Sequence, residues 1–411
     1  MVKTYFFSWA EGCIASNPPW LNQAPISEIL WRICKMKYQV IGPNDPALEV
    51  LATQLKAHPE WETTLTILPW AEYQSKVTET LQASTSTYQA LCIPGHIWLP
   101  GFADEGQLAA FEELLPNLPA DRIDAYKSAE IMPSVADECR YNNSQYILPL
   151  FTDGHILFFR KDVYPLIENN SVLIIDPCGL PEMLENAHLK EGMYPFALKA
   201  HSSEILTDWL PYLWAFGGDI LDDQNNPAFN SKAAISALAF YISLKRFCPP
   251  ETHNFGNQEI ADALKQGRVA MAASWGGQAA MILNAANPFN TFFGSAIFTS
   301  PWNATWGVSI PANQPLSEQI NILNVLYAAA SPAQDLLVTQ IAGSPVRSTS
   351  YSQEELSKYS WLPAQYEMLQ RCKTLPANPV LTRYLGALYQ AVYLAFIGEK
   401  TPQNALNQAA K

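Results

Sequence analysis

The stretch that decides the fold is residues 263–277, ALKQGRVAMAASWGG. Apolar residues at helical spacing predict the end of a helix, and Gly267 supplies its stop. Residues 269–273 are too apolar for a surface loop and too short for a helix, which favours a buried strand. The strand delivers Trp275 at its carboxyl end, where open α/β sheets hold their ligand crevices. Trp275 is therefore either a crevice residue or a core residue followed by an ordinary turn.

Working outward, the chain alternates predicted strands and helices. Strands are expected at 38–42, 63–68 and 88–93, with helices at 46–55 and 73–81 between them. This βαβαβ order predicts a mostly parallel sheet with right-handed crossovers. Further along, the sequence favours a helix at 106–115, two strand pieces within 147–161 joined at 152–154, and a strand at 305–310.

The composition describes a folded protein of more than one core. The chain has 411 residues, 48% hydrophobic and 15% charged, and this length suits two lobes. Its net charge of -13 argues against a nucleic-acid partner. No apolar run is long enough to span a membrane. Seven cysteines without a Cys-x-x-Cys pair and six scattered histidines predict no metal site, no disulfide framework and no cofactor.

Residues 1–37 are expected to form an N-terminal extension outside the main fold. They contain no continuous apolar segment of the kind a secretory signal needs. Two explanations stay open: an export signal has been removed or lost, or the protein does not follow that route.

Three separated blocks agree on a family. They are FTDGHILFFRKD at 151–162, LWAFGGDILDD at 213–223, and the stretch 263–277. In this order and spacing they resemble the family 1 extracellular solute-binding proteins of ABC importers, most of all the maltose and trehalose binders, over roughly residues 38–411. The resemblance implies an α/β, two-lobe periplasmic-binding-protein fold of type II, with a mostly parallel, helix-flanked sheet in each lobe and a hinge between them. The implied lobes are 38–149 plus 301–343 and 150–300 plus 344–411.

The resemblance also implies a function. The chain would be a monomeric, non-enzymatic component that captures a sugar or oligosaccharide and delivers it to ABC permease subunits. It would act in the periplasm or on the outer face of the cytoplasmic membrane. One alternative is a cytoplasmic ligand-binding or sensor protein of the same fold. A thiaminase-like enzyme is disfavoured, because Asp153 and Gly276 stand where that enzyme carries its catalytic Cys and Glu.

Six residues are the predicted ligand contacts. A carboxylate suits sugar hydroxyls, tryptophan rings suit the apolar face of a pyranose, glycine exposes backbone N–H groups, and a guanidinium holds vicinal hydroxyls. Each has a structural alternative: a turn aspartate, a core ring, a plain turn or a surface ion pair. The predicted contacts are Trp70, Asp153, Trp275, Gly276, Trp306 and Arg347.

One departure from the resembling proteins concerns the third predicted strand. Related disaccharide binders carry Asp near its end, where this chain has Gly95 followed by His96. A sugar contact from the first lobe is therefore missing, and either His96 replaces it or the ligand is not a maltose-like sugar.

Overall fold

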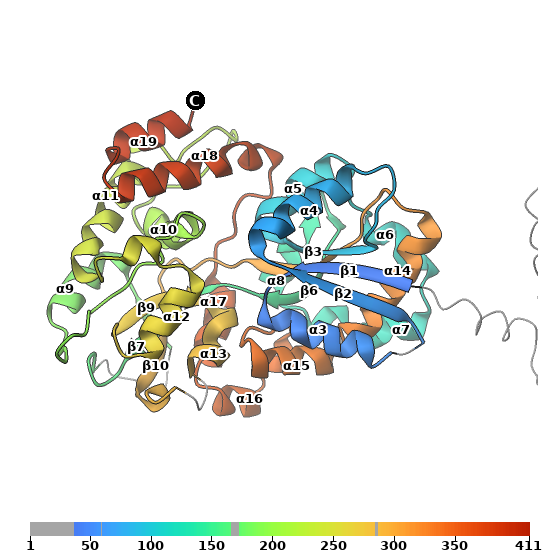
Figure 1. Cartoon of the computed structure of the whole chain (residues 1–411), viewed down its shortest axis with the longest axis horizontal. Helices are drawn as coiled ribbons and strands as arrows, with labels where there is room; N and C mark the ends of the chain where they lie inside the picture. Colours follow the sequence, from blue (N-terminus) through green and yellow to red (C-terminus); the bar gives the residue numbers. More distant parts are fainter. Residues whose placement is uncertain (1–36, 59, 166–171, 284–286) are drawn as a thin grey trace, which may run out of the picture.

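The computed structural model describes residues 37–58, 60–165, 172–283 and 287–411. The predicted extension 1–37 lies outside these residues except for Lys37, which begins the first strand. The described chain forms two helix-flanked sheets that lie side by side, each the centre of one lobe (Figure 1).

The sheet of the first lobe has five strands in the order β2-β1-β3-β11-β6. Strands β1 and β2 pair in parallel, as do β1 and β3, which confirms the predicted βαβαβ order. Every residue of β3 is buried, as expected for a central strand covered on both faces. The strands are β1 (Lys37–Pro43), β2 (Glu62–Leu68), β3 (Ala90–Pro94), β6 (Leu148–Thr152) and β11 (Thr305–Ser309).

The sheet of the second lobe has four strands in the order β8-β10-β7-β9. Its central strand β7 is buried throughout, and its side chains alternate between two cores. Ile156 and Phe158 enter one core, while Leu157 and Phe159 enter the other. The strands are β7 (His155–Arg160), β8 (Leu173–Ile175), β9 (Met271–Trp275) and β10 (Phe293–Phe298).

Each sheet contains one strand that runs against the rest. In the first lobe it is β11, antiparallel to both β3 and β6, and in the second it is β7, antiparallel to β9 and β10. Both strands enter from the other lobe. A strand that arrives across the cleft starts at the edge where the other strands end, so it must run in the opposite direction. The remaining strands of both sheets therefore turn their carboxyl ends toward the cleft.

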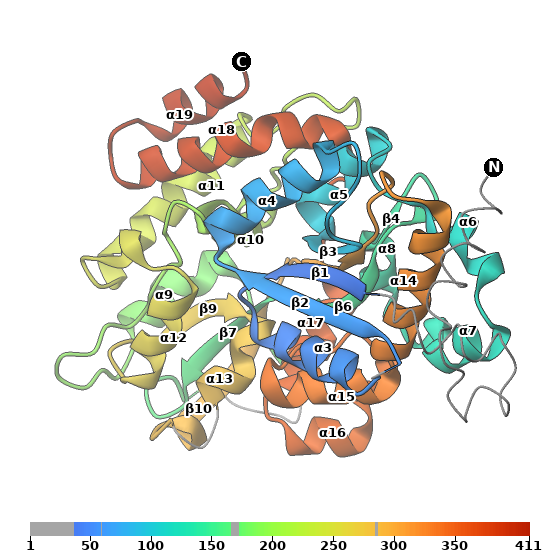
Figure 2. The same ribbon diagram turned by 45° about the vertical axis from the view of Figure 1, so that its right-hand side comes forward.

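Helices cover both sheets, and α18 reaches from the second lobe to α5 of the first (Figure 1 and Figure 2). Within the described ranges, no helix is both long and apolar enough to cross a membrane. In the first lobe the helices are α3 (Pro46–Lys56), α4 (Trp70–Gln82), α5 (Gly95–Asp104), α6 (Phe111–Leu114), α7 (Ala120–Tyr126), α8 (Pro133–Glu138), α14 (Leu316–Ala329) and α15 (Pro332–Ile341). In the second lobe they are α9 (Leu180–Glu185), α10 (Ile205–Ala215), α11 (Lys232–Ser243), α12 (Asn257–Lys265), α13 (Ala279–Leu283), α16 (Gln353–Lys358), α17 (Leu362–Arg371), α18 (Pro379–Phe396) and α19 (Pro402–Ala409).

The predicted helix at 106–115 is wrong. Gly106 has φ 66°, the left-handed conformation that ends a helix, and α6 occupies only Phe111–Leu114. The helix of this region is instead α5, which contains Pro100.

The sheet pairing favours lobe limits that differ from the expected ones. Strand β6 stays paired with β11 as far as Thr152, past the predicted crossing near Pro149. Beyond Gly343, the side chain of Arg347 still bonds first-lobe backbone. We propose that the lobes exchange chain directly after Thr152, just before Thr305 and after Arg347.

Candidate functional site

A cavity of about 170 Å³ lies between the lobes at the carboxyl ends of the first-lobe strands. We call it the cleft cavity. Residues following β1, β2 and β3 form its first-lobe wall, as the sheet topology requires. Loops and helices of the second lobe face them. Its lining is Pro43, Asn44, Asp45, Trp70, His96, Ile97, Phe151, Asp153, Ser203, Glu204, Thr207, Asn257, Trp275, Ala304, Trp306 and Tyr389.

Four of the six predicted ligand contacts meet in the cleft cavity: Trp70, Asp153, Trp275 and Trp306. Trp275 is the last residue of β9, so the sequence placed it correctly at a strand end. Trp70 begins α4 directly after β2, and its side chain is 39% exposed. These residues come from both lobes and from the crossing between them.

The tryptophans of the first-lobe wall hold one another in place. Trp70 stacks on Trp98 with ring centroids 5.2 Å apart, and the Trp306 ring meets Trp70 edge-on at 5.7 Å. Phe151 stacks on Trp306 at 6.0 Å with nearly parallel planes. Such aromatic contacts stabilise the rings beyond their area burial. The wall is therefore a pre-formed platform rather than a set of independent side chains.

Trp275 is fixed by different chemistry. The Nζ atom of Lys199 lies 3.7 Å from its ring centroid, a cation–π contact. Lys199 is fully buried, and burial lowers the pKa of its ammonium group to about 8. Trp275 also hydrogen-bonds Glu204, whose pKa is raised mainly by burial. The ring is thus clamped between a buried cation and a carboxylate.

Asp153 occupies the two-residue link between β6 of the first sheet and β7 of the second. Its backbone N–H donates to the carbonyl of Ala304 at 2.7 Å, and its Oδ1 accepts from the backbone N–H of Gly277 at 3.0 Å. Burial raises the pKa of this carboxyl well above its usual value, and the nearby Asp45 adds to the effect. A Cβ at position 277 would lie 2.6 Å from that Oδ1, so the contact requires glycine.

Gly276, which the sequence predicts as a ligand contact, does not line the cleft cavity. Its N–H donates to the carbonyl of Gly154 at 2.8 Å, and Gln365 Oε1 lies where its Cβ would be. In the loop after Trp275, the N–H groups of Gly276 and Gly277 donate to protein acceptors instead of a ligand. The glycines of this loop are needed for close packing.

Arg347 is also placed elsewhere. The side chain is 1% exposed, and its guanidinium donates to the carbonyls of Lys127 and Ala330, both at 3.0 Å. These residues are the C-caps of α7 and α14. A cation is favourable at helix carboxyl ends, where backbone carbonyls lack intrahelical partners. Arg347 therefore caps two helices and does not contact the cavity.

Several lining residues escaped the sequence analysis: Asn44, Asp45, Glu204, Asn257 and Tyr389. The position of Asp45 just after the predicted strand 38–42 was a usable signal, because strand ends gather at the cleft. Glu204 and Asn257 follow no predicted strand. Tyr389 lies within an amphipathic helix, where nothing separates it from core tyrosines.

The position expected to hold a family Asp is closed to any side chain. A Cβ on Gly95 would lie 2.3 Å from the carbonyl oxygen of Glu138. The next residue, His96, lines the cleft cavity instead, and burial lowers the pKa of its imidazole to about 3. His96 is consequently neutral at physiological pH.

Asp45 offers a test of the electrostatics in the cleft. It is the N-cap of α3 and accepts from the N–H of Ala47 at 2.8 Å, while burial raises its pKa to about 6. Between pH 4 and 6 the folded state keeps a proton that the unfolded chain has lost, so stability falls as pH rises. Asp45→Asn keeps the cap and is expected to remove about 1–3 kcal/mol of that fall.

Urea unfolding of both proteins at pH 4, 5, 6 and 7 measures this difference. Asp335, whose pKa burial also raises to about 6, contributes the same background slope to both proteins. Identical pH dependence in the two would show that the Asp45 carboxyl ionises freely in the cleft.

Comparison with known proteins places the chain among binding proteins. A putative binding protein of Brucella abortus is 23% identical over 222 residues, 50% of this chain and 48% of that protein. A mannitol-binding protein of Pseudomonas aeruginosa is 24% identical over 289 residues, 66% of this chain and 64% of that protein. The chain thus spans about half to two thirds of the length of these curated relatives.

Among solved structures, an ABC transporter solute-binding protein of Agrobacterium radiobacter K84 in complex with ribitol superposes with a TM-score of 0.80. It is 19% identical, and the match covers 91% of this chain and 97% of that one. The predicted two-lobe α/β fold is confirmed. The family described as bacterial extracellular solute-binding protein matches residues 42–321. This chain belongs to the bacterial extracellular solute-binding protein family.

Proposed function

We propose that this protein is the substrate-binding component of an ABC importer and that it captures one small, neutral polyhydroxyl solute, a sugar or a sugar alcohol, in the cleft cavity. Trp70, Trp275 and Trp306 supply the apolar contact surfaces. Asp45, Asp153 and Glu204 supply hydrogen bonds to hydroxyl groups. No chemical change of the solute is involved.

The charge of the cleft cavity carries this proposal. Its lining contains three carboxylate side chains and no Lys or Arg. Where these carboxyl groups are ionised, they disfavour phosphate and carboxylate ligands and accept hydrogen bonds from hydroxyl groups. The buried cation near them, Lys199, contacts the Trp275 ring and does not line the cavity. Raised carboxyl pKa values, caused mainly by burial, also let these groups donate a proton to a ligand oxygen.

The size of the cavity supports a small ligand. A volume of about 170 Å³ lies below the usual 300–1,000 Å³ of sites for drug-sized molecules. The relative named for mannitol and the structure solved with ribitol point to the same class of compound. A polyol or monosaccharide is therefore favoured over a long oligosaccharide.

Closure of the two lobes on the solute follows from how the cavity is built. Asp45 and Trp70 belong to the first lobe, Glu204 and Trp275 to the second, and Asp153 to the link between them. A solute that contacts both walls binds the closed arrangement better than the open one and so shifts the population toward it. We propose that the protein acts as a monomer in the periplasm or on the outer face of the cytoplasmic membrane, where ABC permease subunits recognise its closed form.

Fluorescence titration tests the proposal. D-Mannitol, ribitol or maltose is expected to change intrinsic tryptophan emission saturably, because the rings of Trp70, Trp275 and Trp306 line the cavity. Mass spectrometry should recover the compound unchanged. No response to any neutral sugar or polyol, or recovery of a converted product, would falsify the proposal. Cell fractionation separates the importer from a cytoplasmic sensor, since the importer requires the protein beyond the cytoplasmic membrane.

A further inference from the structure

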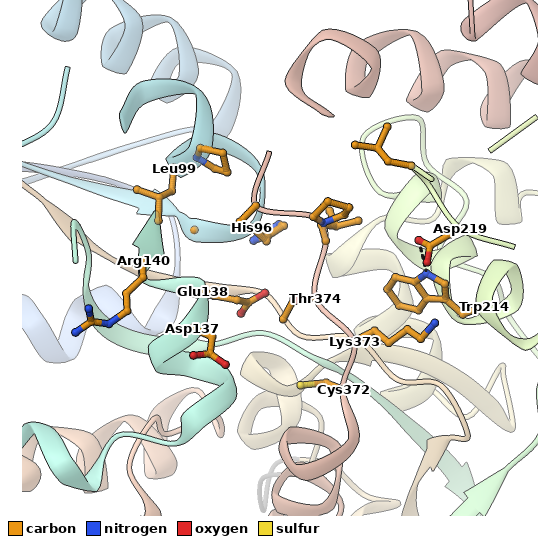
Figure 3. Close-up of a pocket in the computed structure, with 16 residues that line it drawn as sticks. His96, Leu99, Asp137, Glu138, Arg140, Trp214, Asp219, Cys372, Lys373 and Thr374 are labelled. Carbon is orange, nitrogen blue, oxygen red and sulfur yellow. Dashed lines mark hydrogen bonds between the residues drawn. The ribbon is translucent and has the colours of Figure 1, made fainter. Parts of the chain in front are cut away.

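A second cavity lies between the lobes and shares only His96 with the cleft cavity. We call it the hinge cavity; its volume is about 500 Å³. Helices α5 and α8 form its first-lobe wall, and Trp214 and Asp219 face them from the second lobe (Figure 3). The segment 372–377, which joins α17 to α18, runs between the two walls.

Glu138 presents an unused oxygen to the hinge cavity. The side chain is 7% exposed, and its Oε2 accepts from Asn303 Nδ2 at 2.6 Å, Thr305 N at 2.9 Å and Thr305 Oγ1 at 2.7 Å. Its Oε1 is buried and has no partner. Figure 3 shows the carboxyl group directed toward Thr374 across the open space.

His96 presents a second unused polar atom. The side chain is 9% exposed, and its Nδ1 is buried without a hydrogen-bond partner. Burial lowers the pKa of His96 to about 3 and raises that of Glu138 to about 8, so both groups are neutral at physiological pH. Buried polar atoms are nearly always paired in native proteins, so these two atoms, on residues that both line the hinge cavity, call for a partner.

The surroundings define what that partner is. With Oε2 taken by three donors, the Glu138 proton resides on Oε1 and donates. The ring of Trp214, buried and hydrogen-bonded to Asp219 at 3.3 Å, supplies an aromatic surface, and the Nζ atom of Lys373 lies 5.5 Å from its centroid. The Arg140 guanidinium, by contrast, bonds the carbonyl of Asn143 at 2.8 Å and points away from the cavity (Figure 3). The unpaired atoms of Glu138 and His96 beside an aromatic ring match a hydroxylated carbon skeleton. The charged lining residues are balanced in sign, and they are Asp137, Asp219, Arg140 and Lys373.

We propose that the hinge cavity is a second binding site, which takes a small neutral polyhydroxyl compound whose hydroxyl groups complete the hydrogen bonding of Glu138 and His96. Its walls come from both lobes and from the segment that joins them. Occupancy therefore favours one relative placement of the lobes and is coupled to binding in the cleft cavity. This inference stands on the hinge cavity alone and holds even if the cleft takes another ligand.

Fluorine NMR of protein labelled with 5-fluorotryptophan tests the second site. Trp214 reports on the hinge cavity and Trp275 on the cleft, each resonance being assigned with its Trp→Phe variant. D-Mannitol and ribitol are expected to move the Trp214 resonance saturably, with a midpoint of its own. The variant Trp306→Ala, which damages the cleft, should keep the Trp214 response.

Thr374→Trp is the matched variant for the hinge cavity. Thr374 is exposed and lines only this cavity, so an indole there fills the space without touching either core. It should weaken the Trp214 response at least tenfold while Trp275 still titrates. Glu138→Gln keeps one acceptor and one donor and should retain binding.

Three results would overturn the inference: a Trp214 resonance unmoved up to the solubility limit of both compounds, a Trp214 response unaffected by Thr374→Trp, or a common midpoint for Trp214 and Trp275 that both variants abolish together. The last result means one ligand spanning both cavities. A silent Trp275 with a responsive Trp214 would instead reject the proposed function and keep the second site.

Discussion

Replacing Arg347 by methionine is expected to lower the free energy of unfolding by about 3 kcal/mol and to leave ligand affinity unchanged. The guanidinium donates to the carbonyls of Lys127 and Ala330, and it lies 4.5 Å from the ring centroid of Tyr126. Methionine fills similar space but leaves the buried carbonyl oxygen of Ala330 without a donor, and it removes one of the two donors of the Lys127 carbonyl, which still accepts from the N–H of Glu130. Urea unfolding of the variant and of the wild type measures the difference.

Two further variants control this result. Arg347→Lys keeps the charge but loses the forked geometry, so an intermediate loss is expected. Arg383→Met removes the same kind of side chain from an exposed position of α18 and should change stability by less than about 0.5 kcal/mol. Unchanged stability of Arg347→Met together with lost binding would return Arg347 to the ligand site.

Trp306→Ala is expected to weaken binding of the cleft ligand by about 30-fold, equivalent to about 2 kcal/mol. Trp306 lines the cavity from β11 and connects Phe151 on one side with Trp70 on the other. Its removal takes away a contact surface and also frees the Trp70 ring. Isothermal titration with the compound found by fluorescence gives the affinity.

The matched controls separate ring contact from simple loss of tryptophan. Trp306→Phe keeps an aromatic face and should lose clearly less affinity than Trp306→Ala. Trp61→Phe changes a tryptophan of the first-lobe core that is absent from the cavity lining, so affinity should stay unchanged. Equal affinities of Trp306→Ala and the wild type would place the ligand elsewhere.

Strand positions and the cavity walls that depend on them were predictable from the sequence. Short apolar runs fixed β1, β9 and β11 to within about two residues, because buried strands tolerate few polar side chains. The alternation of β-branched and apolar residues fixed β2, which has no buried residue, equally well. Carboxyl ends of strands meet at one edge of a sheet. Trp275 and Asp153 could therefore be assigned to a common crevice although 122 positions separate them in the chain.

Features that the sequence did not predict, the helix α5 and the role of Arg347, depend on tertiary contacts. The helix α5 contains Pro100 and two glycines, which oppose a helix locally, yet packing against β3 and α18 stabilises it. That packing carries His96 into the cleft. The sequence around Arg347 does not distinguish a structural arginine from a ligand-binding one. Only the fold shows that two helix ends converge on it.

The position of the link formed by Asp153 and Gly154 bears on which solute contact persists while the lobes close. These two residues stand between a strand of one sheet and a strand of the other, so any rotation of the lobes pivots beside them. Points near an axis move little. If a solute bonds Asp153 as proposed, we expect that bond to persist from first encounter to full enclosure, while Asp45 and Glu204 approach the solute as the lobes close. Affinity for the encounter and selectivity for the enclosed state can thus evolve separately.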